Sequence, residues 1–187
     1  MLHNEKNINN QDKLIPTCNK ICSFCFLNYT NLLSNNFLFK NLEHCEIGNT
    51  IKEVNHLSKS YKKGEIIGFA GDPYEKLIII VKGSVSCEVT DFEGKILQLE
   101  TIKAPDTIAP SNIFGDNNIL HHDITAKEDS KLLFINKESI LHLLKNNDII
   151  LKNYLDIVAN NVHNLSDRIK MLGLHSIREK IAMYLLD

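Results

Sequence analysis

The chain has 187 residues, 43% of them hydrophobic, which is enough for one well-packed domain with an appendage but short for two full domains. Its formal net charge of −2 gives no attraction to polyanions, so the chain alone is not expected to bind nucleic acid tightly. The longest aliphatic run, Leu77 to Val81, is too short to cross a bilayer. No secretion signal precedes it, so we expect a cytoplasmic protein whose five cysteines stay reduced.

Residues 1–28 are expected to form a flexible arm, because the first seventeen are polar and Asn-rich and show no apolar period. The arm carries Cys18, Cys22 and Cys25, a spacing that lets three thiolates surround one metal ion or iron–sulfur cluster. Such a site needs a fourth ligand, and Cys45 is the candidate. The alternative is a set of free thiols on a mobile arm, and the sequence leaves both open.

Residues 29–146 are expected to form a β-rich domain. Apolar residues at mixed helical spacings predict one or two short helices between Tyr29 and His56. From Tyr61 onward, short runs of Ile, Val and Leu alternate with glycine-containing turns such as Asp91 to Gly94, which is typical of an antiparallel β-roll or barrel. A last strand over Leu132 to Ile135 and a short helix then close the roll.

Strand alternation indicates which side chains face the interior of this roll. Val85, Cys87 and Val89 share one face of a strand, so Cys87 should point inward as a small core residue. Counting back from the apolar residues Ile124 and Ala126, Leu120 and His122 should face inward while His121 and Asp123 face outward. An inward imidazole is either a metal ligand or a hydrogen-bonded core histidine.

Residues 147–173 are expected to form a coiled-coil dimerisation helix. Its apolar residues step alternately by 4 and 3 over three heptads with polar residues between them, which is a narrow two-in-seven stripe. A helix packed only on its own domain needs a wider apolar face, so we favour a homodimer. Gly173 ends this helix, and the capping box of Ser176 and Glu179 begins another over residues 176–187. The stripe consists of Leu151, Leu155, Val158, Val162, Leu165, Ile169 and Leu172.

The glycine-punctuated roll, the long helix and the segment Ser176 to Ala182 resemble the Crp/Fnr family of bacterial transcription regulators over roughly residues 30 to 187. The resemblance implies an α+β, mainly β, fold: a cyclic-nucleotide-binding-like β-roll or jelly roll followed by the dimerisation helix. Residues 176–187 would be the first helix of a winged helix-turn-helix domain that the chain does not complete. DNA would be bound only through that missing part.

Family members that bind cyclic nucleotides use a Glu for the ribose and, ten residues later, an Arg for the phosphate. Alignment on Ala126 and Lys127 places Pro110 and Leu120 at these positions. No arginine precedes Arg168 to make the bidentate phosphate contact. We therefore expect a ligand other than a cyclic nucleotide.

The segments Ile108 to Phe114 and Ala126 to Ser130 are similar to HcpR-type regulators of the hybrid cluster protein, which respond to nitric oxide and nitrite. This resemblance implies a haem in the sensor pocket, with His122 as the first candidate ligand and Cys87 as the second. The alternative is an Fnr-like iron–sulfur or thiol redox sensor that uses the N-terminal cysteines. No motif of a catalytic site stands out, so an enzyme is not expected. The pocket candidates are His122, Cys87, His121, Pro110 and Leu120.

Overall fold

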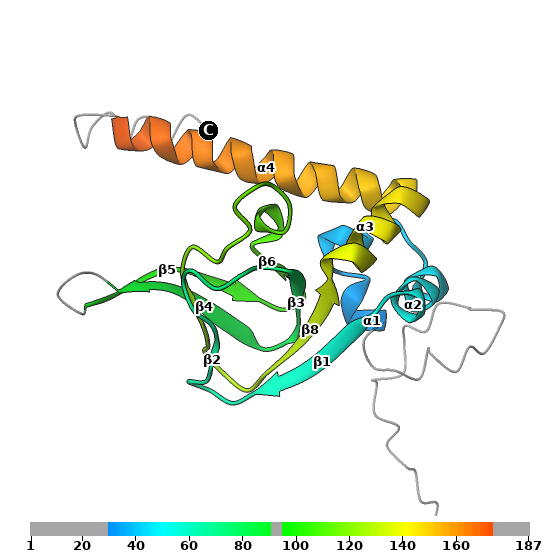
Figure 1. Cartoon of the computed structure of the whole chain (residues 1–187), viewed down its shortest axis with the longest axis horizontal. Helices are drawn as coiled ribbons and strands as arrows, with labels where there is room; N and C mark the ends of the chain where they lie inside the picture. The colour runs from blue at the N-terminus through cyan, green and yellow to red at the C-terminus, as the bar shows by residue number, and fades with distance from the viewer. Residues whose placement is uncertain (1–29, 91–94, 174–187) are drawn as a thin grey trace, which may run out of the picture.

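The computed structural model describes residues 30–90 and 95–173. Short helical segments precede the strands, and two helices follow them (Figure 1). The helical elements are α1 (Thr30–Leu33), η1 (Phe37–Phe39), α2 (His44–Glu53), η2 (Pro110–Asn112), α3 (Lys137–Asn146) and α4 (Asp148–Gly173). The strands are β1 (His56–Tyr61), β2 (Ile66–Gly68), β3 (Lys76–Lys82), β4 (Ser84–Thr90), β5 (Ile96–Lys103), β6 (Thr107–Ile108), β7 (Asp123–Ala126) and β8 (Ser130–Asn136).

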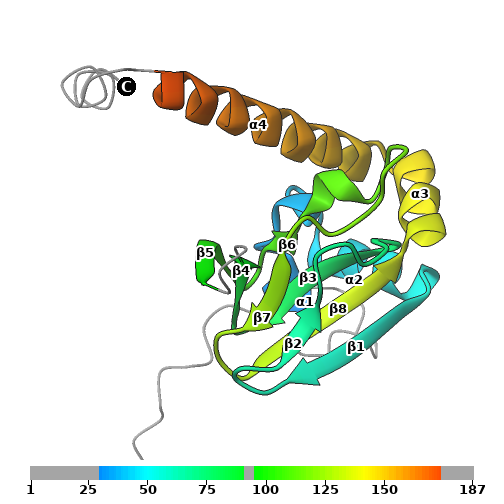
Figure 2. The ribbon, with the colours of Figure 1, turned by 60° about the vertical axis from the view of Figure 1, so that its left-hand side comes forward.

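The strands form two antiparallel four-stranded sheets that enclose a roll. One sheet has the order β1-β8-β3-β6 and the other the order β2-β7-β4-β5. Figures 1 and 2 show α4 lying along one side of this roll, with α3 as the connection between β8 and α4. The predicted fold, a mainly β roll followed by a long helix, is therefore confirmed.

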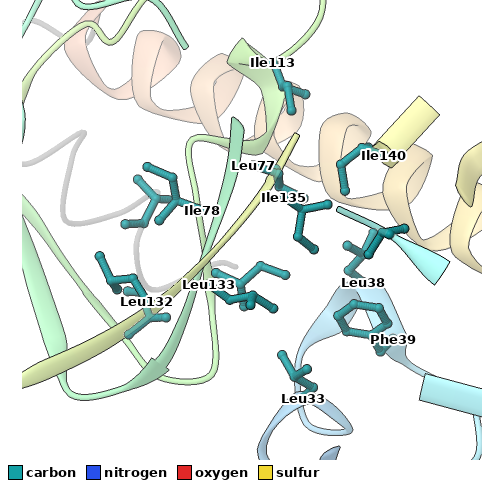
Figure 3. Packing of buried hydrophobic residues seen from close by; sticks show 14 of the residues in the cluster. Leu33, Leu38, Phe39, Leu77, Ile78, Ile113, Leu132, Leu133, Ile135 and Ile140 are labelled. Atoms are coloured by element: carbon teal, nitrogen blue, oxygen red, sulfur yellow. The ribbon is translucent and has the colours of Figure 1, made fainter. Parts of the chain in front are cut away.

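Strand β3 lies at the centre of the core, and its five inner residues from Leu77 to Val81 are all buried. A strand buried on both faces is a continuous apolar run, which is why this segment lacks alternation. Leu132 and Ile78 point into the roll, while Leu133 and Ile135 point to the other side, where they meet Leu33, Leu38 and Phe39 of the N-terminal helical segments (Figure 3). The short helices thus cover one sheet.

The first half of α4 is tied to the domain beneath it. Asn153 is buried, and its Nδ2 donates hydrogen bonds to the carbonyl oxygens of Leu38 and Lys40, at 3.0 and 2.7 Å. These carbonyls end η1, so the amide caps the 3-10 turn and holds the long helix against it. Ile150 and Tyr154 are also buried in the core.

A single residue, Asn147, separates α3 from α4. The β-roll and α3 end at Asn146, and α4 begins at Asp148. The expected arm over residues 1–28 and the expected further helix over residues 176–187 lie outside the described residues. In the described part of the chain, every helix is too short or too polar to cross a bilayer.

Candidate ligand cavity between the roll and the long helix

A cavity of about 420 Å³ lies between the roll and α4, within the size range of small-molecule sites. The roll contributes β5, the segment around η2 and the turn before β7, and α4 contributes Ile157 and four residues of its second half. Its lining residues are Phe37, Glu100, Ile102, Asp106, Thr107, Ala109, Pro110, Ser111, Asn112, His121, His122, Ile157, Asn161, Asn164, Leu165 and Arg168.

Two hydrogen bonds join α4 to the wall of this cavity. The Tyr154 hydroxyl donates to the carbonyl oxygen of Pro110 at 2.9 Å, and the Asn161 Nδ2 donates to the Ser111 Oγ at 3.0 Å. The Tyr154 ring also packs edge-on against Phe114, with ring centroids 5.6 Å apart. Because Pro110 and Ser111 belong to η2, a ligand that moves this turn acts directly on the long helix.

His122 has a ring nitrogen that could bind a ligand. Its Nε2 is buried and has no hydrogen-bond partner, and such an atom carries a desolvation cost that a ligand would remove. Burial lowers the pKa of His122, so the ring is neutral near pH 7 and keeps a lone pair for a metal or a donor. Its side chain borders the cavity, as expected.

His121 also borders the cavity, although strand alternation predicted that it faces outward. β7 begins only at Asp123 and both histidines lie in the bend before it, so alternation cannot be counted back to them. A bend can present successive side chains to one cavity. The two histidines therefore reach this site together.

Cys87, Pro110 and Leu120 lie in three different places. Cys87 is fully buried in the roll, as predicted, and burial raises the pKa of its thiol to about 12, so the thiolate needed as a metal ligand is disfavoured. Pro110 lines the cavity. Leu120 instead lines a separate hollow of about 380 Å³ beside β2, where it lies against Gly68.

The sequence did not predict which residues of the helix, or which charged residues, line the cavity. Arg168 of α4 borders the cavity, as do the carboxylates of Glu100 and Asp106. The helix residues that line the cavity run from Ile157 to Arg168. From the sequence, the one available sign of the helix contribution was that five of these residues share one helix face, namely residues 157, 161, 164, 165 and 168.

The predicted stripe on α4 is exposed for most of its length. Val162, Leu165 and Ile169 are 58%, 58% and 68% exposed, and Leu151 and Leu155 are exposed as well. Val158 differs, because it is partly buried against the core of its own chain. The side chain of Leu172 lies outside the described residues. A row of exposed apolar side chains on one helix is typical of a surface that pairs with another chain.

The cysteine site is only partly covered by the structure, because Cys18, Cys22 and Cys25 lie outside the described residues. Cys45, on α2, is disulfide-bonded, whereas all five cysteines were expected to be reduced. A disulfide sulfur is not a thiolate, so Cys45 in this state cannot serve as the fourth metal ligand. In residues 30–90 and 95–173, no group of three or more His, Cys, Asp or Glu is arranged to hold a metal ion.

Residues 58–147 match the family model of the cyclic nucleotide-binding domain. The cAMP-activated global transcriptional regulator CRP of Pasteurella multocida is 26% identical over 132 residues, which cover 71% of this chain and 63% of that protein. The chain thus spans less than two thirds of the length of that relative.

Solved structures share the fold. A transcriptional regulator from Thermotoga maritima is 28% identical with a TM-score of 0.62, over 68% of this chain and 97% of that one. The sensor domain of the transcriptional regulator DNR from Pseudomonas aeruginosa is 21% identical with a TM-score of 0.62, over 79% and 94%. Residues 58–147 thus match the cyclic nucleotide-binding domain, in a chain that is similar to Crp/Fnr-type transcription regulators.

Proposed function

We propose that this chain is the sensor and dimerisation part of a cytoplasmic bacterial transcription regulator and not an enzyme. One observation carries the proposal: α4 lines the cavity with Asn161, Leu165 and Arg168 and also carries the exposed apolar stripe. A ligand that prefers one position of this helix will shift how two helices pair, because only differential affinity moves such an equilibrium. DNA would be bound by a domain that follows α4.

We propose that the protein responds to nitric oxide, or to another signal of nitrosative or redox stress, and that a bound haem senses this signal. The resemblance of Ile108 to Phe114 to HcpR-type regulators supports this. The residues present also fit a haem: a neutral imidazole with an unpartnered buried nitrogen at His122, apolar side chains at Ile102, Ile157 and Leu165, and a cation at Arg168. When bound, the haem would supply an iron that takes a diatomic gas.

In this proposal the protein residues position and shield the group. His122 would bind the iron, the apolar side chains would exclude water, and Arg168 would pair with a carboxylate of the haem. The carboxylates of Glu100 and Asp106 would repel an anion on their side of the cavity, so they favour an orientation with the acidic groups toward Arg168. The same repulsion, together with Pro110 and Leu120 at the two family positions, argues against a cyclic phosphate.

The dimer is tested by sedimentation velocity of the wild type and of Val162→Glu. Val162 is more than half exposed, so the charge should leave the roll folded and yield monomers. Leu141→Glu is the matched control, since Leu141 is an exposed apolar residue on α3, outside the stripe, and it should remain dimeric. A Val162→Glu dimer of wild-type stability would refute the pairing surface.

Haem binding is tested by titrating haemin and, in parallel, cAMP into the purified chain. A Soret band of bound haem is expected in the wild type, and it should be lost in His122→Ala and kept in His142→Ala, an exposed histidine on α3. Binding of cAMP instead of haem, or a band unchanged in His122→Ala, would overturn the assignment. If haem does not bind, but anaerobic reconstitution gives the absorption spectrum of an iron–sulfur protein, the alternative Fnr-like sensor would be favoured.

A further inference from the structure

The hollow of about 380 Å³ beside β2 is separate from the cavity that α4 covers. Most of its side chains are apolar or aromatic, and Ile78 points into the roll (Figure 3). Because apolar walls hold water poorly, such a hollow favours an apolar occupant. We call it the apolar hollow. Its apolar and aromatic side chains are Ile67, Pro73, Tyr74, Ile78, Leu120 and Phe134.

A polar hollow of about 300 Å³ adjoins the apolar one, because Glu75 and Lys76 line both. Lys76 of β3 pairs with Asn136 of β8, which also lines the polar hollow. Two residues further along, Ile78 pairs with Phe134, and both line the apolar hollow. Paired residues, and residues two apart on a strand, share a face of the sheet. The polar and the apolar hollow are therefore neighbours along one face of β3 and β8.

The polar hollow contains charges of both signs. Its cations are Lys76 and Lys137. Its carboxylates are Glu75 and Glu138. In the amide orientation that satisfies both of its side-chain atoms, the Asn118 Oδ1 accepts a hydrogen bond from the Lys137 Nζ. No ion pair joins these four charges to one another or to any other residue in 30–90 and 95–173, so they are available to a ligand that carries both signs.

We propose that the two hollows together bind a zwitterionic α-amino acid with a large apolar side chain. The ligand carboxylate pairs with a lysine of the polar hollow, its ammonium pairs with a glutamate, and its side chain enters the apolar hollow. A fatty acid fits less well, because the glutamates repel its head group. Asp72 adds to this repulsion, since it lines the apolar hollow and accepts a hydrogen bond from the Phe69 N–H at 2.9 Å.

The two hollows share no lining residue with the cavity under α4. Leu120 lines the apolar hollow, whereas His121 and His122, which follow it, line the cavity. The Leu120 N–H donates a hydrogen bond to the carbonyl oxygen of Asp72 at 2.9 Å, so backbone contacts hold the wall between the two sites. Substitutions in one site can therefore be made without altering the side chains of the other.

The test is isothermal titration calorimetry of L-phenylalanine with the purified chain. The wild type should bind it, and Lys76→Gln should raise the dissociation constant by at least about tenfold, because a charged hydrogen bond is lost. Lys82→Gln is the matched control. Both lysines are exposed ends of β3, but Lys82 lines neither hollow, so this variant should bind like the wild type. Circular dichroism verifies that both variants are folded.

Three related probes separate the parts of the ligand. 3-Phenylpropionate lacks the ammonium, phenethylamine lacks the carboxylate, and glycine lacks the apolar side chain, so each should bind at least about tenfold more weakly than L-phenylalanine. Equal binding of 3-phenylpropionate or phenethylamine would refute the zwitterion. Equal binding of glycine would refute the role of the apolar hollow.

A variant of the other site shows where the ligand binds. Arg168→Gln alters the cavity under α4 and should leave the affinity for L-phenylalanine unchanged. If Arg168→Gln weakens binding and Lys76→Gln does not, L-phenylalanine occupies that cavity and the proposal is overturned. The absence of a binding heat at millimolar L-phenylalanine would overturn it as well.

Discussion

The two halves of α4 have opposite surroundings, although they belong to one unbroken helix of 26 residues. In the first half, Ile150, Asn153 and Tyr154 are buried and bonded to the domain. In the second half, Val162 and Ile169 are exposed, and the helix meets the domain chiefly along the cavity. The first half is thus packed on its own chain, whereas the second half presents an exposed apolar surface, which is typical of an interaction site.

The largest effect is expected from Tyr154→Ala. The substitution removes a buried ring packed against Phe114 and a hydrogen bond to Pro110, so the free energy of unfolding should fall by about 3–5 kcal/mol. Urea unfolding followed by circular dichroism measures this loss. The matched control is Leu155→Ala at the next, exposed position, where a change below about 0.5 kcal/mol is expected. Both variants belong in the Val162→Glu background, which removes the contribution of association.

Asn153→Ala tests the polar anchor of the same half. The substitution leaves the carbonyl oxygens of Leu38 and Lys40 without their donor, and unsatisfied buried groups should cost about 1–3 kcal/mol. Asn160→Ala is the control, because Asn160 is exposed on the same helix and alanine favours the helix slightly. Equal stability of the two variants would show that the first half is not anchored through this amide.

Much of the fold follows from periodicity in the sequence. The glycine-separated apolar runs and the 4-and-3 stripe each extend over many residues, so single exceptions do not change the prediction. Cys87 was placed correctly because it lies inside the regular strand β4. Val158 shows the limit of this reasoning. It belongs to the stripe by spacing, yet its own domain covers it in part. Spacing alone does not tell whether a residue of the stripe packs on its own domain or on a second chain.

The site was harder to predict, because its residues come from irregular segments and from distant parts of the chain. The bend that holds His121 and His122 has no period from which the direction of a side chain can be counted. Arg168 lies 60 positions beyond Ile108 in the sequence, and it reaches the cavity only because Asn153 and Tyr154 fix the direction of α4. Contacts of this kind depend on tertiary packing.

A double-mutant cycle of Asn161→Ala and Ser111→Ala locates the boundary between the two halves. Asn161 makes a hydrogen bond from the second half of the helix to η2, on an exposed surface, so its coupling energy should be only about 0.5 kcal/mol. Urea unfolding of the two single variants and the double variant gives this value. A coupling of zero would place the boundary before Asn161 and leave Tyr154 as the link between α4 and the cavity wall.

The smallest effect concerns pH and the cavity that the second half of α4 covers. Burial lowers the pKa of His122 below its ordinary value of 6.5, so the unfolded chain takes up a proton at this ring more readily than the folded one. The contribution of neutral His122 is therefore complete above pH 6.5 and is lost as the pH falls through the lowered pKa of the folded state.

In His122→Gln, the decrease in unfolding free energy between pH 7.5 and pH 5 should be smaller than in the wild type, as urea titrations at both values would measure. His142→Gln, at an exposed site, should follow the wild-type profile. Parallel profiles for His122→Gln and the wild type would mean that water in the cavity hydrates the imidazole ring. The second half of α4 would then cover the site less closely than its lining residues indicate.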